Sequence, residues 1–318
     1  MNRRGWIGLD INTNPLGMGC WQISGNYTLD NKPQGWGNVD ENLALEILEE
    51  AINSGIDFFD TAQGYNFGQS EHLLGTAIKN TGKQVVVCTK IPLTPLEITE
   101  NKIGSDFCNR VEKSLDNLNL SRIDILLIHN PPDDLIWSNF DYRVLDMLVN
   151  VGTIGTYGVS SKSISGAKNV IENKVGTTLE WVFNIFERRP IKDLFPLIDT
   201  NQFNFIARSP LSRGLINNKY LDQDPAFDSD DFRSTLPMDW VNWTINQVRA
   251  YHNKCGPGNN IVKNAIDFCL HFKEVNALIV GIKTKQQLRE YLSFCASGTS
   301  DFNLDSLSDI SDCFPNWK

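Results

Sequence analysis

Apolar and polar positions along this chain follow two alternating patterns. Eight short runs rich in apolar and β-branched residues are typical of buried strands, at residues 16–20, 56–60, 84–90, 123–129, 155–160, 179–183, 203–208 and 277–281. Between and after them, apolar residues recur with the helical period, at residues 42–54, 70–79, 103–117, 141–149, 165–171, 191–197, 261–272 and 285–294. The pattern therefore predicts eight β/α units in succession.

The fold class follows from this alternation. Strands that are joined through helices by short links run parallel, and eight of them can close into a (β/α)8 TIM barrel, an α/β fold. The open alternative, a doubly wound sheet, normally carries Gly-x-Gly-x-x-Gly after its first strand, whereas Gly17-Met-Gly19-Cys-Trp-Gln22 ends in Gln. Residues 214–260, rich in Asp, Asn and Pro, are predicted to be a polar insertion or loop region after the seventh strand. We therefore expect residues 1–318 to be one barrel domain.

Composition narrows the classes of partner. With 29 Lys and Arg against 38 Asp and Glu, the net charge is −9, so the chain as a whole does not attract nucleic acid or anionic lipid. The seven cysteines include no Cys-x-x-Cys pair, and no apolar run is long enough for a membrane span. The histidines show no metal-ligand spacing. We expect a cytoplasmic protein with no metal and no nucleic-acid or membrane partner, and the sequence leaves the oligomeric state open.

Three of the first four predicted strands end in an ionisable side chain: Asp60, Lys90 and His129. Because the C-terminal ends of barrel strands meet at one face, these side chains should lie close together. Any one of them can simply reach solvent at a strand end. Three that converge on one rim need partners or a ligand, since burying a charge costs free energy. Tyr65 follows five residues after Asp60, in the loop on the same rim.

These four residue types suit a site that delivers a proton. The pKa of free tyrosine is about 10, and an adjacent Lys90 ammonium is expected to lower the pKa of Tyr65 toward neutrality. Asp60 would hold Lys90 charged and in place, and His129 would orient a carbonyl oxygen. Such a site protonates an oxyanion as it forms, without an activated Ser or Cys nucleophile.

The same residues belong to a series of motifs that runs almost end to end. In order, they are Leu16-Gly-Met-Gly-Cys-Trp21, Gly55-Ile-Asp-Phe-Phe-Asp-Thr-Ala-Gln-Gly-Tyr65, Gly68-Gln-Ser-Glu71, Val87-Cys-Thr-Lys90, Asp124-Ile-Leu-Leu-Ile-His129, Gly155-Thr-Tyr-Gly-Val-Ser160, Ser209-Pro-Leu211 and Val280-Gly281. In these motifs the chain resembles the aldo-keto reductases. The resemblance implies a (β/α)8 barrel that binds NADP(H) without a Rossmann motif and transfers hydride to an aldehyde or ketone. It implies that Asp60, Tyr65, Lys90 and His129 are catalytic, with Tyr65 the general acid in reduction and the base in oxidation.

The resemblance also implies the cofactor contacts. They are Gly19, Cys20, Trp21, Asp60, Ser160, Ser161, Glu180, Arg208, Ser209, Leu211, Ser212, Gly214, Gly281, Lys283, Thr284, Gln287 and Glu290. Lys283, Thr284 and Gln287 occupy positions at which the family binds the 2′-phosphate, and a Lys beside a helix N-terminus suits a dianion. This favours NADPH over NADH. The residues expected to face the substrate are Trp21, Tyr65, His129 and Trp137.

Four positions depart from the family's pattern. Ser161 replaces an Asn and Glu180 falls where a Gln usually holds the nicotinamide carboxamide. Arg208 stands where many members stack a Tyr on the nicotinamide ring, and Tyr291 replaces an Asn at the adenine. A guanidinium can stack as a plane, and pairing between Arg208 and Glu180 would make these two replacements coupled.

The leading functional hypothesis is an NADPH-dependent reductase of a small polar carbonyl compound, such as a sugar derivative. An alcohol or sugar dehydrogenase that works in the oxidative direction is an alternative within the same class. A cofactor-binding regulatory subunit of the same fold with little turnover is a third reading, to which the altered residues at 161, 180 and 208 lend the only support. Turnover on a carbonyl panel separates the last reading from the first two.

Overall fold

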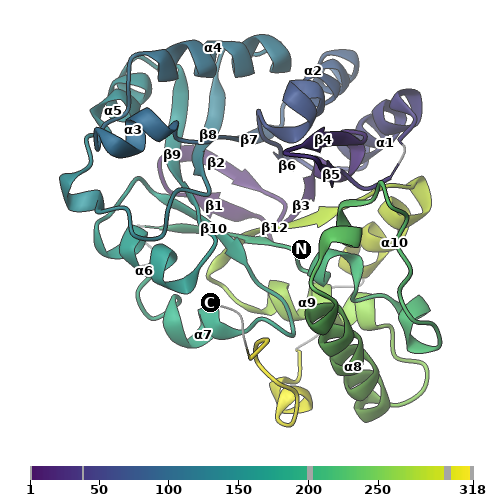
Figure 1. The fold of residues 1–318 in the computed structure, drawn as a ribbon. Helices are drawn as coiled ribbons and strands as arrows, with labels where there is room; N and C mark the ends of the chain where they lie inside the picture. Colours follow the sequence, from purple (N-terminus) through teal and green to yellow (C-terminus); the bar gives the residue numbers. More distant parts are fainter. Residues whose placement is uncertain (1, 38, 199–202, 297–301, 316–318) are drawn as a thin grey trace.

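The structure, a computed structural model, describes residues 2–37, 39–198, 203–296 and 302–315. Within these ranges, parallel strands form a closed barrel in the order β10, β11, β12, β3, β6, β7, β8, β9 (Figure 1). The barrel strands are β3 (Leu16–Gly19), β6 (Phe58–Asp60), β7 (Val86–Ile91), β8 (Ile123–His129), β9 (Ile154–Ser160), β10 (Thr178–Val182), β11 (Asn204–Arg208) and β12 (Val275–Gly281). The prediction of a (β/α)8 barrel is confirmed, and each strand's ends agree with the sequence prediction within two residues.

Helices surround the barrel, as Figure 1 shows. They are α1 (Glu41–Asn53), α2 (Gln69–Thr81), α3 (Pro95–Thr99), α4 (Asp106–Leu118), α5 (Arg143–Asn150), α6 (Ile164–Glu172), α7 (Arg189–Asp193), α8 (Met238–Cys255), α9 (Ile261–His271) and α10 (Lys285–Ala296). Their apolar faces pack on the outside of the strands to form the main core. In the described part of the chain, no helix has both the length and the apolar character needed to cross a membrane.

Two hairpins lie outside the predicted pattern. β1 (Arg4–Trp6) and β2 (Leu9–Thr13) pair antiparallel, and the Trp6 ring stacks on Phe58 with 4.8 Å between centroids. Phe58 is the first residue of β6, so this hairpin covers the N-terminal end of the barrel. A second hairpin, β4 (Tyr27–Leu29) with β5 (Lys32–Gln34), lies in the connection from β3 to α1. The first hairpin closes the barrel at the end opposite the rim on which Asp60 and His129 lie.

The predicted insertion at residues 214–260 differs from the expectation of a polar loop. It contains α8, an 18-residue helix that buries Trp240, Val241, Ile245 and other apolar residues at helical spacing. Together with Trp36 and Phe232, these side chains form a separate small hydrophobic cluster. The segment therefore contributes to a hydrophobic cluster although it is polar overall, because its apolar residues lie on one face of the helix.

Gly158 lies where a side chain would clash with the neighbouring strand. It lies opposite Thr178 in the β9 and β10 ladder, and a Cβ at position 158 would lie 1.8 Å from the Thr178 carbonyl oxygen. Because that atom is backbone, Gly158→Ala should lower the free energy of unfolding by about 3 kcal/mol, as measured by urea denaturation. Gly64→Ala is the matched control, since a Cβ there meets no atom within 4 Å. Equal effects of the two substitutions would contradict this packing.

Candidate active site

The four residues with the candidate chemistry come from three neighbouring strands and one loop. Asp60 and His129 are the last residues of β6 and β8, and Lys90 lies near the end of β7. Tyr65 begins η2 (Tyr65–Gly68), a short 3-10 helix that follows β6. Since β7 pairs with β6 on one side and with β8 on the other, the structure brings all four side chains to one rim of the barrel.

The loop that carries Tyr65 has a strained backbone. Asn66 and Phe67 have φ angles of 48° and 54°, in the left-handed region that disfavours residues other than Gly. The Asn66 side chain donates a hydrogen bond to the Ser24 carbonyl oxygen at 2.7 Å, which holds the loop against the β3 connection. Strain of this kind persists where surrounding contacts determine the conformation, and here it accompanies the placement of Tyr65.

Lys90 lies at the centre of the site. Its side chain is fully buried, and its Nζ donates to Asp60 Oδ1 at 2.5 Å and to the Thr61 carbonyl oxygen at 2.9 Å. The same Nζ lies 3.4 Å from the Tyr65 hydroxyl and 3.5 Å from Glu180 Oε2. One ammonium group therefore contacts the phenol and two carboxylates.

Burial and charge act in opposite directions on this group. Burial lowers the pKa of Lys90, but the carboxylates of Asp60 and Glu180 raise it by more, so that it lies well above the usual value. Burial and the Glu180 charge raise the pKa of Asp60, although Lys90 opposes them. Lys90 is therefore a permanent cation, and the two acids compete for it.

The pKa of Tyr65 differs from the expectation. Burial raises it above the usual value, and the lowering effect of Lys90 is smaller and is opposed by Asp60 and Glu180. The expectation that Lys90 brings the pKa of Tyr65 toward neutrality was therefore wrong for the protein alone. The main physical reason is that burial disfavours the charged phenolate, and the carboxylates of Asp60 and Glu180 oppose the stabilisation that Lys90 provides. Tyr65 is accordingly a phenol at neutral pH, the form that can donate a proton.

His129 lies beside Tyr65 in an edge-to-face arrangement, with ring centroids 6.0 Å apart and an angle of 84° between the planes. Burial lowers the pKa of His129 well below its usual value, and the positive charges of Lys90, Arg208 and Lys162 lower it further. His129 is therefore a neutral imidazole at neutral pH. A neutral imidazole can still donate one hydrogen bond to a carbonyl oxygen.

Glu180 and Arg208 are paired, as the sequence hypothesis required. Arg208 Nε lies 3.7 Å from Glu180 Oε1, and the guanidinium also donates to the Ser161 carbonyl oxygen at 2.9 Å. Ser160 donates to the same Glu180 oxygen at 3.0 Å. The replacements at positions 161, 180 and 208 thus form one connected network, which reaches Lys90 through Glu180.

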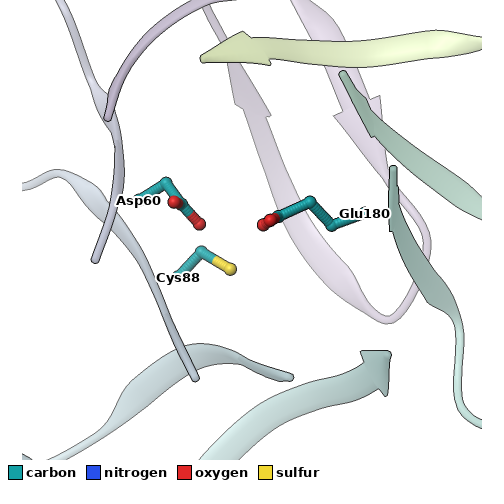
Figure 2. A group of neighbouring side chains, drawn as sticks. All are labelled: Asp60, Cys88 and Glu180. Atoms are coloured by element: carbon teal, nitrogen blue, oxygen red, sulfur yellow. The ribbon is translucent and has the colours of Figure 1, made fainter. Parts of the chain in front are cut away.

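Figure 2 shows Asp60, Cys88 and Glu180 pointing toward one another inside the barrel. One potential ligand atom from each lies within 4.8 Å of the others, and all three residues are buried. The spacing would suit a metal ion, but Lys90 Nζ lies against both carboxylates. A cation of that kind would have to displace the ammonium, so the geometry fits an ion pair better than a metal site.

The residues expected at a cofactor lie at the C-terminal ends of the strands that complete the barrel. Gly19, Ser160, Arg208 and Gly281 are the last residues of β3, β9, β11 and β12. Cys20, which follows β3, is buried, and its amide donates to the Asp60 carbonyl oxygen at 2.8 Å. The expected nicotinamide contacts and the four candidate catalytic residues therefore share one rim.

The loop after β11 has an unusual backbone. Ser209, Ser212 and Arg213 have φ angles of 56°, 47° and 55°, and Gly214 has a φ of 77°. Leu211 lies buried within the loop. Left-handed residues in such turns can point successive amide groups into one concave surface, which is a known way to bind anions. This loop lines a groove with the side chains of α8.

The start of α10 is held by its own polar residues. The Lys283 amide donates to Gln287 Oε1 at 2.9 Å, and the Gln287 amide donates to Thr284 Oγ1 at 3.1 Å. Lys283 Nζ donates to the Trp36 carbonyl oxygen. Glu290 accepts a hydrogen bond at 3.4 Å from the Asn side chain that caps α9. The hydrogen bonds that the structure gives the Lys283 side chain thus include one to a neutral backbone carbonyl oxygen, that of Trp36.

The two tryptophans expected at the substrate have different positions. Trp21 stacks on Tyr65, with centroids 5.8 Å apart and 21° between the planes. Trp137 is only 3% exposed and packs on Phe140 at 5.4 Å. The contacts that the structure describes thus bring Trp21 to the site and place Trp137 in the core.

Sequence reasoning missed an aromatic cluster beside the site. Phe232, from the insertion, lies 4.6 Å from the rings of both Trp21 and Trp36. The Phe232 amide donates to the Gly35 carbonyl oxygen at 3.1 Å, so the insertion is joined to the β4 and β5 hairpin. Single large aromatic residues in polar segments were the signal that could have indicated it.

Comparisons with known proteins extend these observations. The model of the aldo/keto reductase family matches residues 15–311. Aldo-keto reductase YhdN of Bacillus subtilis is 31% identical over 234 residues, which cover 71% of this chain and 67% of that protein. The NADH-specific methylglyoxal reductase of Escherichia coli is 27% identical over 222 residues, covering 65% of this chain and 66% of that protein.

Solved structures share the fold. The holo form of aldo-keto reductase AKR11C1 from Bacillus halodurans has a TM-score of 0.75 at 20% identity, with 99% of each chain covered. An aldo/keto reductase from Klebsiella pneumoniae in complex with NADP and acetate has a TM-score of 0.69 at 16% identity, with 100% of this chain and 98% of that chain covered.

The barrel, its rim and these similarities define the class of protein, an oxidoreductase that uses a nicotinamide cofactor. Since the family model matches nearly the whole sequence, from residue 15 to residue 311, the chain belongs to the aldo/keto reductase family.

Proposed function

We propose that this protein is an NADP(H)-dependent carbonyl reductase in which Tyr65 is the general acid. The observation that carries the proposal is the fully buried Lys90, whose Nζ lies 2.5 Å from Asp60 and 3.4 Å from the Tyr65 hydroxyl. An Asp-anchored ammonium beside a phenol stabilises negative charge as it develops on the phenol oxygen. This arrangement suits proton donation better than any nucleophilic chemistry.

Each candidate catalytic residue has a part in the proposed proton transfer. Tyr65 donates its hydroxyl proton to the carbonyl oxygen of the substrate, and Lys90 stabilises the phenolate that remains. His129, neutral because of burial and nearby cations, donates a hydrogen bond that orients the carbonyl oxygen. In alcohol oxidation the same proton returns to Tyr65, so the site serves both directions.

The rim has features that fit a dinucleotide. Gln22 Oε1 and Trp36 Nε1 are buried and have no hydrogen-bond partner in the described structure. Gln22 lies against Gly281, and Trp36 contributes the carbonyl that Lys283 contacts. A bound nicotinamide cofactor would supply the hydride. We propose that the ends of β3, β9, β10 and β11 hold its nicotinamide end and that the loop at 209–214 holds its pyrophosphate.

The start of α10 favours NADPH in this proposal, with Lys283, Thr284 and Gln287 at the 2′-phosphate. Lys283→Ala should weaken NADPH binding about 10- to 100-fold, because a hydrogen bond to a charged group is lost. NADH binding should change less than about 3-fold. Titration of cofactor fluorescence measures both.

Lys285→Ala is the matched control. Lys285 lies on the same helix start, but its Nζ pairs with Glu46 at 2.6 Å on the surface. Its replacement should leave both affinities nearly unchanged. Equal losses of NADPH and NADH affinity in Lys283→Ala would contradict the assignment and would favour an NADH-specific site, such as the name of the Escherichia coli relative describes.

We propose a small polar carbonyl compound as the substrate, with sugars and their derivatives included. The test is a cofactor titration followed by a panel of simple aldehydes, hydroxyaldehydes, sugars and nucleotide sugars. Turnover of polar members supports the proposal. Cofactor binding without turnover on any member would favour the regulatory-subunit reading instead, and turnover confined to apolar aldehydes would overturn the choice of substrate class.

A further inference from the structure

Glu180 does more in this structure than occupy a cofactor-binding position. Its Oε2 lies 3.5 Å from Lys90 Nζ, the nitrogen that also lies 3.4 Å from the Tyr65 hydroxyl. The two contacts share one atom, so the Glu180 carboxylate and the Tyr65 oxygen lie within about 7 Å of each other, in a buried region where charges interact strongly. Glu180 stands where the family usually has a Gln, so this chain has an additional acidic group inside the proposed proton-transfer network.

We propose that Glu180 is a positioning residue that, together with Asp60, neutralises Lys90 and thereby opposes ionisation of the Tyr65 hydroxyl. The inference rests on the proposed role of Tyr65 as proton donor. Two carboxylates face one ammonium, and Asp60 already contacts it at 2.5 Å. The second carboxylate therefore removes much of the positive potential that would otherwise stabilise the phenolate.

The other groups around Tyr65 do not cancel this effect. The titratable or charged groups that surround Tyr65 and Lys90 are Asp60 on β6, Cys88 on β7, His129 on β8, Glu180 on β10 and Arg208 on β11. Burial raises the pKa of Cys88 well above its usual value and lowers that of His129, so both are neutral near Tyr65 at mildly alkaline pH. Arg208 is a cation near this network, and it is paired with Glu180 itself. Lys162 is a second cation, whose charge acts on His129.

The consequence concerns the pH range of the reaction. Reduction needs the phenol, so its rate should stay constant to higher pH than it would with a neutral residue at position 180. Oxidation needs the phenolate, so its rate should keep rising with pH over the same range. The overall equilibrium is unchanged, because it depends only on the free energies of the reactants and products.

The direct test is the ionisation of Tyr65, measured by tyrosinate absorbance as the difference between each protein and its Tyr65→Phe counterpart. In Glu180→Gln the Tyr65 signal should appear at a pH about one unit lower than in the wild type. The loss of the carboxylate and the release of Arg208 act in the same direction. Glu180→Asp keeps the charge and should restore most of the wild-type behaviour.

Turnover gives a second readout. The reduction rate of Glu180→Gln at saturating cofactor should begin to fall at a pH about one unit lower than that of the wild type.

Glu97→Gln is the control for removing a buried, paired carboxylate. Glu97 on α3 pairs with Arg110 on α4 at 2.6 Å, and its replacement should shift neither the Tyr65 titration nor the pH dependence of turnover. An unchanged Tyr65 titration in Glu180→Gln would overturn the inference. That titration needs no turnover, so its result does not depend on the proposed function. A failure of the proposed function would appear separately, as full activity of Tyr65→Phe.

Discussion

Tyr65→Phe should lower the rate of carbonyl reduction by about 10²- to 10⁴-fold while cofactor affinity stays within about 2-fold of the wild type. The phenyl ring keeps the stacking on Trp21, at 5.8 Å between centroids, and loses only the hydroxyl beside Lys90. The loss should therefore fall on the chemical step. Single-turnover measurement of cofactor oxidation, with a separate binding titration, distinguishes the two effects.

Tyr157→Phe is the matched control for removing a tyrosine hydroxyl. Tyr157 lies on β9, and its hydroxyl donates to Asp146 of α5 at 2.7 Å, on the outside of the barrel. This variant should retain near-normal turnover. If Tyr65→Phe reduced substrates at the wild-type rate, another group would have to donate the proton, and the assignment of Tyr65 would be wrong.

Lys90→Met should lower the free energy of unfolding by about 3 to 5 kcal/mol at neutral pH and abolish measurable turnover, because it leaves buried carboxylates without their cation. Without the cation, burial should hold the pKa of Asp60 in the folded variant above its unfolded value. A group of this kind stabilises the fold at low pH and loses that contribution as the pH rises. The deficit should therefore be largest above neutrality and should shrink on acidification toward pH 5, as urea denaturation at several pH values would show.

Two further variants test whether the pH-dependent loss of stability in Lys90→Met is specific to the buried Lys90. Lys168 pairs with Asp193 at 2.8 Å near the surface, so Lys168→Met should cost less than about 1 kcal/mol, with little dependence on pH. Adding Asp60→Asn to Lys90→Met should recover part of the lost stability, because it removes a buried acid that has lost its cation, whereas Glu180 keeps Arg208 as a partner. A pH-independent loss in Lys90→Met would indicate that packing, not charge, explains the burial of Lys90.

The barrel was predictable because its strands are short apolar runs that alternate with segments of helical periodicity, and each of the eight appears in the structure. The segments missed were those with weak patterns. The hairpin of β1 and β2 is short and partly exposed, and α8 carries its apolar residues at helical spacing among many polar ones. Both depend on tertiary packing that the local sequence does not reveal. The hairpin packs on Phe58, and α8 packs in a cluster with Trp36.

The positions of the candidate catalytic residues were predictable where they follow from the ends of the strands. Asp60, Lys90 and His129 could be placed on one rim from the alternation alone, and Tyr65 from its distance along the chain. The electrostatics could not be predicted in the same way, because the pKa of Tyr65 is raised mainly by its burial and further by Asp60 and Glu180, against the opposing effect of Lys90. The burial of Tyr65 and the position of Glu180 beside Lys90 follow only from the three-dimensional structure.

The central claim is that the protein reduces a carbonyl group with hydride from nicotinamide C4 and a proton from the Tyr65 hydroxyl. The most direct test uses NADPH that carries deuterium at the transferable C4 position, an aldehyde panel and mass spectrometry of the alcohol products. We predict one deuterium on the carbinol carbon for each cofactor oxidised by the wild type, and at least about 10²-fold less deuterated alcohol from Tyr65→Phe in the same time. Alcohol without deuterium, or bound NADPH that is not oxidised by any member of the panel, would contradict it.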